Sequence, residues 1–216
     1  SLSHYDINPL YTFLSDTIGR SNTERLFKLY RVGTSKKWNG SAVFWQVDSN
    51  GQVHTGKIMG YDAKTGHRLK VPHPHVCWVH TELRLPGFNL CQCFFGEHLL
   101  VRYSDKTVFI VESEKTAIIC ATYWGLTEDS LWVACGGMTY LTKERLQPLI
   151  DEGRYIQLFP DHDGIERWTK IAKSIGYKRL SIRTDFVTKY WFQSTRPRGA
   201  RQVDRALPKS QTGFQS

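Results

Sequence analysis

The stretch Val108-Phe109-Ile110-Val111-Glu112 sets the pattern for the second half of the chain. Its four apolar residues form a continuous run, which is typical of a strand buried on both faces of a parallel sheet. A second buried strand is predicted at 131–135, and further strands are predicted at 155–159 and 179–182. Helix-forming segments at 116–124, 142–150 and 165–175 separate them. This β-α-β alternation predicts an α/β fold in which helices cover a four-stranded parallel sheet.

Acidic residues directly follow two of these strands. Glu112 follows the first strand, and Asp161 and Asp163 follow the third, while Gly136-Gly137 ends the second. Because the carboxyl ends of parallel strands meet at one edge of a sheet, we expect the three carboxylates to converge there, with both aspartates on the same side. Each acid alone could instead cap a helix. Together they are the hard oxygen ligands that Mg²⁺ or Mn²⁺ prefers, so the sequence predicts a metal site.

The first half of the chain has a different rhythm. Segments 8–18 and 22–32 are predicted helices, the second capped by Asn22. Residues 40–70 alternate apolar and polar side chains around two turns, which predicts a small antiparallel meander. We therefore expect an α+β subdomain over 1–104, followed by the parallel-sheet domain over 105–190.

Charge is distributed unevenly along the 216 residues, whose net charge is +9. Residues 1–104 carry 12 basic and 7 acidic side chains, whereas basic and acidic residues balance over 105–190. At 40% hydrophobic residues, the composition excludes a disordered chain, and no apolar run is long enough to form a membrane-spanning helix. The odd count of five cysteines indicates reduced thiols and a cytoplasmic protein.

The ordered motifs resemble a known family. A strand ending in Glu112, a glycine after the next strand and Asp161-His162-Asp163 after the third are similar to the Toprim pattern of bacterial primases, topoisomerases and some nucleases. Upstream, the segments 30–33, 42–45 and 56–59 are similar to the basic subdomain that precedes Toprim in replicative primases. Residues 8 to about 190 resemble, more closely, an uncharacterised Toprim-containing family of bacterial mobile elements. The resemblance implies a Rossmann-like Toprim domain.

That resemblance also implies a function. Glu112, Asp161 and Asp163 would be the catalytic metal ligands of a primase-like nucleotidyltransferase that synthesises primers with Mg²⁺. A Toprim nuclease using the same acids, or a degenerate protein that only binds nucleic acid, are the alternatives. The expected partners are single-stranded DNA, nucleotides and replication or mobilisation proteins, in the bacterial cytoplasm.

A primase-like protein needs cations for the phosphates of its template and nucleotides. The resemblance assigns Lys57 to this role, and the expected phosphate-binding set is Lys57, Arg31, Lys36, Lys37, Lys70 and Lys115. These side chains could instead be ordinary solvated surface, and Lys115 could lie on the outer face of its helix. Trp38, Trp45 and Tyr61 could stack on bases or belong to the core.

Two segments remain. Residues 73–98 contain seven histidines and cysteines, but their spacing matches no closed zinc site, so we expect no zinc in this chain. Residues 191–216 repeat Phe-Gln-Ser at 192–194 and 214–216 and resemble a translated CRISPR repeat. We expect this tail to be disordered and not native to the protein; the competing interpretation is a flexible basic arm that binds nucleic acid.

Overall fold

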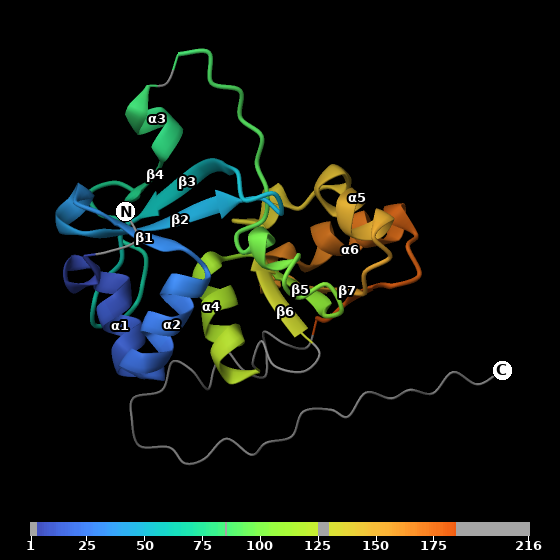
Figure 1. The fold of residues 1–216 in the computed structure, drawn as a ribbon, viewed down its shortest axis with the longest axis horizontal. Coiled ribbons are helices and arrows are strands. Elements are labelled where there is room, and N and C mark those ends of the chain that lie inside the picture. The colour runs from blue at the N-terminus through green and yellow to red at the C-terminus, as the bar shows by residue number, and fades with distance from the viewer. Residues whose placement is uncertain (1–3, 85, 125–129, 185–216) are drawn as a thin grey trace.

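Two sheets lie next to each other, each with helices packed on it, in the computed structural model of residues 4–84, 86–124 and 130–184 (Figure 1). The first half of the chain builds an antiparallel sheet and the second half a parallel sheet. The predicted α/β architecture, with an antiparallel subdomain that precedes the parallel-sheet domain in the sequence, is therefore confirmed. The tail predicted over 191–216 lies outside the described residues.

The antiparallel sheet has the strand order β1-β2-β3-β4. Its strands are β1 (Val32–Ser35), β2 (Ser41–Val47), β3 (Val53–Met59) and β4 (Val76–Trp78). β2 and β3 form the predicted meander, joined by a turn in which the Asp48 carboxylate accepts backbone N–H bonds from Asn50 and Gln52. β1 and β4 were not predicted, because such short strands are defined by the neighbour they pair with rather than by their own pattern.

Three helices belong to the first half of the chain: α1 (Pro9–Ile18), α2 (Arg20–Leu29) and α3 (Val79–Leu83). The Asn8 side chain accepts two backbone N–H bonds from the first turn of α1. The prediction that Asn22 caps the second helix is wrong, because Asn22 lies within α2 and its side chain donates to the backbone oxygen of Ile18. Among the described helices, none has the length and apolar character needed to cross a membrane.

The parallel sheet has the order β6-β5-β7-β8. Its strands are β5 (Thr107–Val111), β6 (Ser130–Ala134), β7 (Ile156–Phe159) and β8 (Leu180–Ile182), and its helices are α4 (Glu114–Tyr123), α5 (Lys143–Asp151) and α6 (Ile165–Ile175). α4 covers one face of the sheet, while α5 and α6 cover the other (Figure 1). Right-handed crossovers require this arrangement, because the chain moves one way from β5 to β6 and the other way from β6 to β7 and β8.

The two halves share one hydrophobic core. Phe95 joins them by exchanging backbone hydrogen bonds of 2.9 and 3.0 Å with Ala134 at the edge of the parallel sheet. The Phe95 ring packs on Tyr30 and Phe44 of the first half, and the Tyr30 hydroxyl donates to the backbone oxygen of Trp132 at 2.7 Å. The antiparallel sheet is therefore held in a fixed position against the carboxyl edge of the parallel sheet.

Candidate functional site

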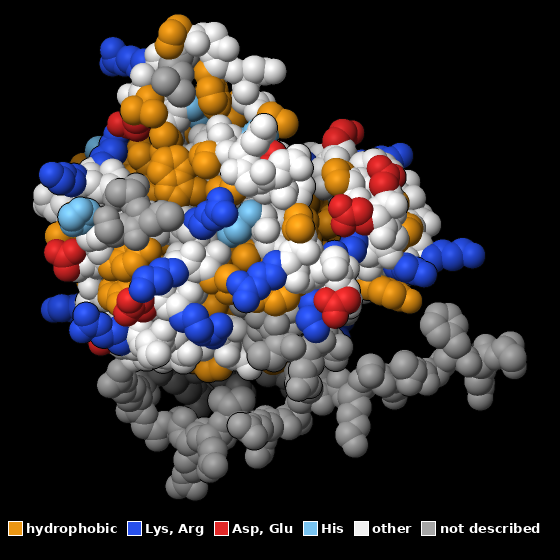
Figure 2. All heavy atoms as spheres, viewed as in Figure 1, with side chains coloured by type: hydrophobic (Ala, Val, Ile, Leu, Met, Phe, Trp, Pro, Cys, Tyr) orange, Lys and Arg blue, Asp and Glu red, His pale blue; other side chains and the backbone are white. Residues whose placement is uncertain are grey.

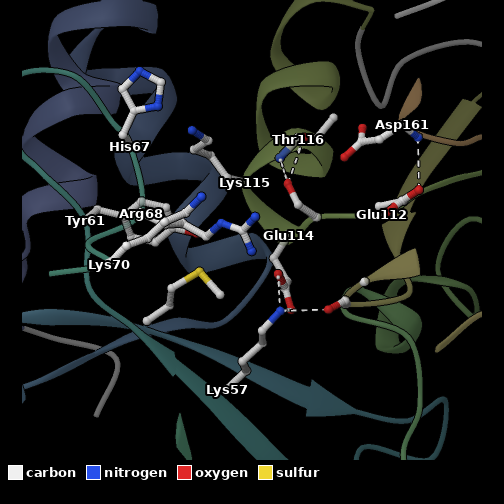
Figure 3. Close-up of a pocket in the computed structure, with 14 residues that line it drawn as sticks. Lys57, Tyr61, His67, Arg68, Lys70, Glu112, Glu114, Lys115, Thr116 and Asp161 are labelled. Carbon is white, nitrogen blue, oxygen red and sulfur yellow. Dashed lines mark hydrogen bonds and ion pairs between the residues drawn. The ribbon is translucent and has the colours of Figure 1, made fainter. Parts of the chain in front are cut away.

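A pocket of about 460 Å³ lies between the carboxyl edge of the parallel sheet and the antiparallel subdomain (Figure 3). Two groups of oppositely charged side chains face each other across it. We call Glu112, Glu114 and Asp161 the acidic wall, and Arg68, Lys70 and Lys115 the basic wall. A cavity with one wall of each sign is suited to a ligand that carries both anionic groups and a bound cation.

Glu112 follows β5 and is fixed by the loop that follows β7. Its Oε1 atom accepts the backbone N–H of Asp161 at 3.0 Å, and only 7% of the residue is exposed. A side chain at position 164 would collide with this carboxylate, so Gly164 leaves the space that Glu112 fills. The ends of two parallel strands thus place Glu112 and Asp161 next to each other, as the sequence predicted for these two acids.

The acid pair is electrostatically unfavourable without a cation. Burial and the neighbouring Asp161 carboxylate raise the pKa of Glu112 to about 7. Burial and the charge of Asp163 also raise the pKa of Asp161. Mg²⁺ is bound in many sites by one or two carboxylates, with waters and substrate phosphates completing its shell. Two hard oxygen donors that repel each other beside an open pocket fit such an ion, so Glu112 and Asp161 are the residues that would hold it.

Asp163 is placed differently from the prediction. It lies in a 3₁₀ turn (His162–Gly164), where side chains do not alternate as in a strand, and it lines a separate hollow beside Glu166 and Lys170. Asp161 and Asp163 therefore do not face the same cavity. Within the described residues, no three His, Cys, Asp or Glu side chains are grouped closely enough to hold a metal ion.

Lys57 and Glu114 form a buried ion pair in the pocket. Lys57 Nζ lies 3.2 and 3.3 Å from the two Glu114 carboxylate oxygens and donates to the backbone oxygen of Gly136 at 2.7 Å. Lys57 is 7% exposed and Glu114 2% exposed. Lys57 thus lines the pocket, but its ammonium group already has two partners. Glu114 was not predicted as a site residue, because a pair separated by 57 positions leaves no local signal in the sequence.

Lys115 belongs to the basic wall rather than to the outer face of α4. Its Nζ donates to the backbone oxygen of Gly66 at 2.7 Å and lies 5.7 Å from the centre of the Tyr61 ring. Burial and the nearby Arg68 guanidinium lower the pKa of Lys115 to about 8. Arg68 and Lys70, in contrast, are exposed and project into the pocket from the opposite side (Figure 3).

Half of the expected phosphate-binding residues line the pocket and half do not. Lys57, Lys70 and Lys115 are at the pocket, whereas Arg31, Lys36 and Lys37 lie outside it. Lys37 pairs instead with Glu82 of α3, with 2.6 Å between Nζ and Oε2.

Tyr61 lines the pocket, but it is only 2% exposed and presents little of its ring for base stacking. All five cysteines are free thiols, as expected.

Comparisons with known proteins agree with this architecture. A chain in a structure of bacteriophage T7 lagging-strand DNA polymerase interacting with the primase domains of two gp4 subunits is 13% identical, with a TM-score of 0.52. That match covers 74% of this chain and 73% of the other. The primase fragment of the bacteriophage T7 primase-helicase protein is 15% identical, with a TM-score of 0.50, covering 74% of this chain and 60% of the fragment. These matches show that the fold is primase-like.

No curated protein gives a significant sequence match. A family model matches residues 8–162, which include the antiparallel sheet and strands β5, β6 and β7 of the parallel sheet. Because this match covers more than half of the sequence, the chain belongs to the family described as Domain of unknown function (DUF6371).

Proposed function

We propose that this chain is a primase-like protein of the Toprim type that transfers nucleotides onto nucleic acid with Mg²⁺ or Mn²⁺. The observation that carries the proposal is the pocket in which the Glu112–Asp161 pair faces Arg68 and Lys70. The primase-like fold supports it. We also propose single-stranded DNA and nucleotides as partners, and replication or mobilisation proteins of a bacterial mobile element as the setting.

The residues of the pocket would have separate roles. Glu112 and Asp161 would hold the metal ion, which would neutralise charge on the phosphates as the reaction proceeds. Arg68 and Lys70 are exposed and free to turn toward phosphate oxygens. Lys57 and Glu114 would fix the floor of the pocket, because their ion pair joins β3, the start of α4 and the backbone after β6.

The proposed reaction is an in-line displacement. A primer or nucleotide 3′-hydroxyl oxygen forms a new bond to the α-phosphorus of a nucleoside triphosphate. The bond from that phosphorus to the bridging oxygen breaks, pyrophosphate leaves with the bonding electrons, and the hydroxyl proton passes to solvent. Asp163 lies beside Asp161 but outside the pocket, so we assign it an indirect role through its charge.

Primer synthesis on single-stranded DNA with labelled nucleotides and Mg²⁺ tests this function. We expect incorporation by the unmodified chain and a loss of roughly a hundredfold or more in Asp161→Asn. Asp151→Asn is the matched control, because Asp151 is an exposed acid at the end of α5, away from the pocket. Degradation of the DNA instead of incorporation would favour the nuclease alternative. Nucleic-acid binding with neither activity would favour a degenerate binding protein.

A further inference from the structure

Four aromatic rings form a continuous row beside the pocket. We call this the aromatic row: Tyr140, Trp78, His80 and Phe88. Ring centres are 6.2 Å apart for Tyr140 and Trp78, 6.0 Å for Trp78 and His80, and 4.9 Å for His80 and Phe88. The last two rings are nearly parallel, with 10° between their planes.

The aromatic row lies outside the hydrophobic core. None of its four members belongs to the described core cluster or packs against it, and Tyr140 and Phe88 are each 36% exposed. Hydrophobic side chains are visible at the surface beneath α3 in Figure 2. Aromatic side chains are usually the main contributors to a core, and a contiguous group of them left partly exposed indicates an interaction surface.

One end of the row lies next to residues that line the pocket. Trp78 is the register partner of Lys57 across β3 and β4. In the loop after β6, the Tyr140 backbone N–H donates to the backbone oxygen of Gly137 at 3.0 Å. Because glycine carries no side chain, Gly137 leaves room for the Tyr140 ring. Lys57 and Gly137 both line the pocket. The row therefore runs outward from the candidate site.

The middle of the row is fixed in place. Thr55 Oγ1 lies 2.8 Å from His80 Nδ1, and Thr55 itself is buried in β3. This contact sets the plane of the imidazole, and the Phe88 ring stacks on it. Because these rings are already ordered, a ligand that stacks on them loses less conformational entropy than one that must order the surface first.

We propose that the aromatic row is a stacking track that guides a single nucleic-acid strand to the pocket. This proposal rests on the proposed action on nucleic acid and adds the surface that holds the strand. Bases of any identity stack on aromatic faces, which suits a strand that must pass without sequence selection. On the α3 side of the track, Lys37 pairs with Glu82, and the neighbouring Lys36 is exposed. The excess of basic over acidic residues in 1–104 favours the same partner.

Fluorescence anisotropy tests the track with two probes in a buffer free of divalent ions and nucleotides. One probe is a mixed-sequence single-stranded DNA oligonucleotide, and the other is an abasic oligonucleotide of the same length. We expect Phe88→Ala and Tyr140→Leu each to bind the first probe about tenfold more weakly and the abasic probe unchanged, because only base stacking is lost. Phe88→Trp should restore the affinity. Leu83→Ala and Leu90→Ala are matched controls, since both leucines are exposed, lie in the same part of the chain as Phe88 and carry no ring.

Three results would overturn the track. Phe88→Ala and Tyr140→Leu could bind the DNA as the unmodified chain does, which would favour a protein partner for the aromatic row. They could weaken both probes equally, or the unmodified chain could show no preference for the probe that carries bases. Incorporation assays that depend on Asp161 test the proposed function separately, because the anisotropy buffer contains neither metal nor nucleotide.

Discussion

The two walls of the pocket are built in opposite ways. Glu112 and Glu114 are buried and held by backbone or ion-pair contacts, and Glu112 packs against Gly164. On the other side, Arg68 and Lys70 are exposed and come from an irregular segment between β3 and β4. The acidic wall is therefore preorganised, whereas Arg68 and Lys70 of the basic wall can adjust to a ligand.

The difference between the two walls suits two separate roles, metal binding and phosphate binding. A metal ion needs ligands fixed at defined positions, and burial of the acids strengthens their interaction with it. Side chains that contact the phosphate groups of a moving nucleic-acid strand need positive charge and sufficient length, but no fixed geometry. Substitutions in the acidic wall should accordingly change stability and ion binding, while substitutions in the basic wall should change affinity and its dependence on salt.

The largest expected effect concerns the buried ion pair between Lys57 and Glu114 of the acidic wall. Lys57→Met leaves the Glu114 carboxylate buried without its partner, which should lower the free energy of unfolding by about 3–5 kcal/mol in urea titrations. The double variant Lys57→Met/Glu114→Leu should recover part of that loss. Lys170→Met is the matched control, because its pair with Glu166 is exposed, and its urea midpoint should not change. A small effect of Lys57→Met would mean that the pair does not hold the wall together.

Next in size is the packing of Glu112 against the turn after β7. Gly164→Ala should lower the free energy of unfolding by about 1–3 kcal/mol, because the added methyl group occupies the space of the carboxylate. In a Glu112→Ala background the same substitution should cost much less. Equal costs in the two backgrounds, measured by thermal unfolding, would show that the two residues are not in contact.

The raised pKa of Glu112 predicts a pH dependence. Its pKa is about 7 in the folded protein against an ordinary value of 4.5, so the folded state binds the proton more tightly. Stability from this group is full below pH 4.5 and is lost as the pH rises through 7. Glu112→Gln should flatten this decline in urea midpoints measured from pH 5 to pH 8 without divalent ions. An unchanged slope would contradict the pKa assignment.

The smallest effect belongs to the basic wall. Arg68→Gln and Lys70→Gln should each weaken binding to single-stranded DNA a few-fold and reduce the slope of log affinity against log salt by roughly one. Lys143→Gln is the control, since Lys143 is exposed at the start of α5 and does not line the pocket. Salt slopes identical to that of the unmodified chain would remove Arg68 and Lys70 from the binding surface.

Local sequence patterns were sufficient to predict that Glu112 lies at the carboxyl edge of the parallel sheet. Val108–Val111 is apolar throughout, and its strand must lie between two covered faces, which places Glu112 at the sheet edge without further information. The conformation of the turn after β7 was not predicted correctly. Asp161-His162-Asp163 can be read as alternating strand, but the chain enters a 3₁₀ turn there, so the two aspartates separate.

The features that the sequence did not predict depend on contacts between residues far apart along the chain. β1 contains Gly33 and Ser35, which have no strong strand preference, and it is stabilised by its hydrogen bonds to β2. The Lys57–Glu114 pair joins residues 57 positions apart, and the aromatic row joins Tyr140 to Trp78 across the two halves. Neither arrangement can be inferred from spacing along the chain.

Calorimetric titration of Mg²⁺ into the unmodified chain, Asp161→Asn and Asp151→Asn tests most directly whether the acidic wall is a metal site. We expect Mg²⁺ to bind the unmodified chain and Asp151→Asn, and binding to be lost in Asp161→Asn. Equal Mg²⁺ affinity in all three proteins would contradict this expectation.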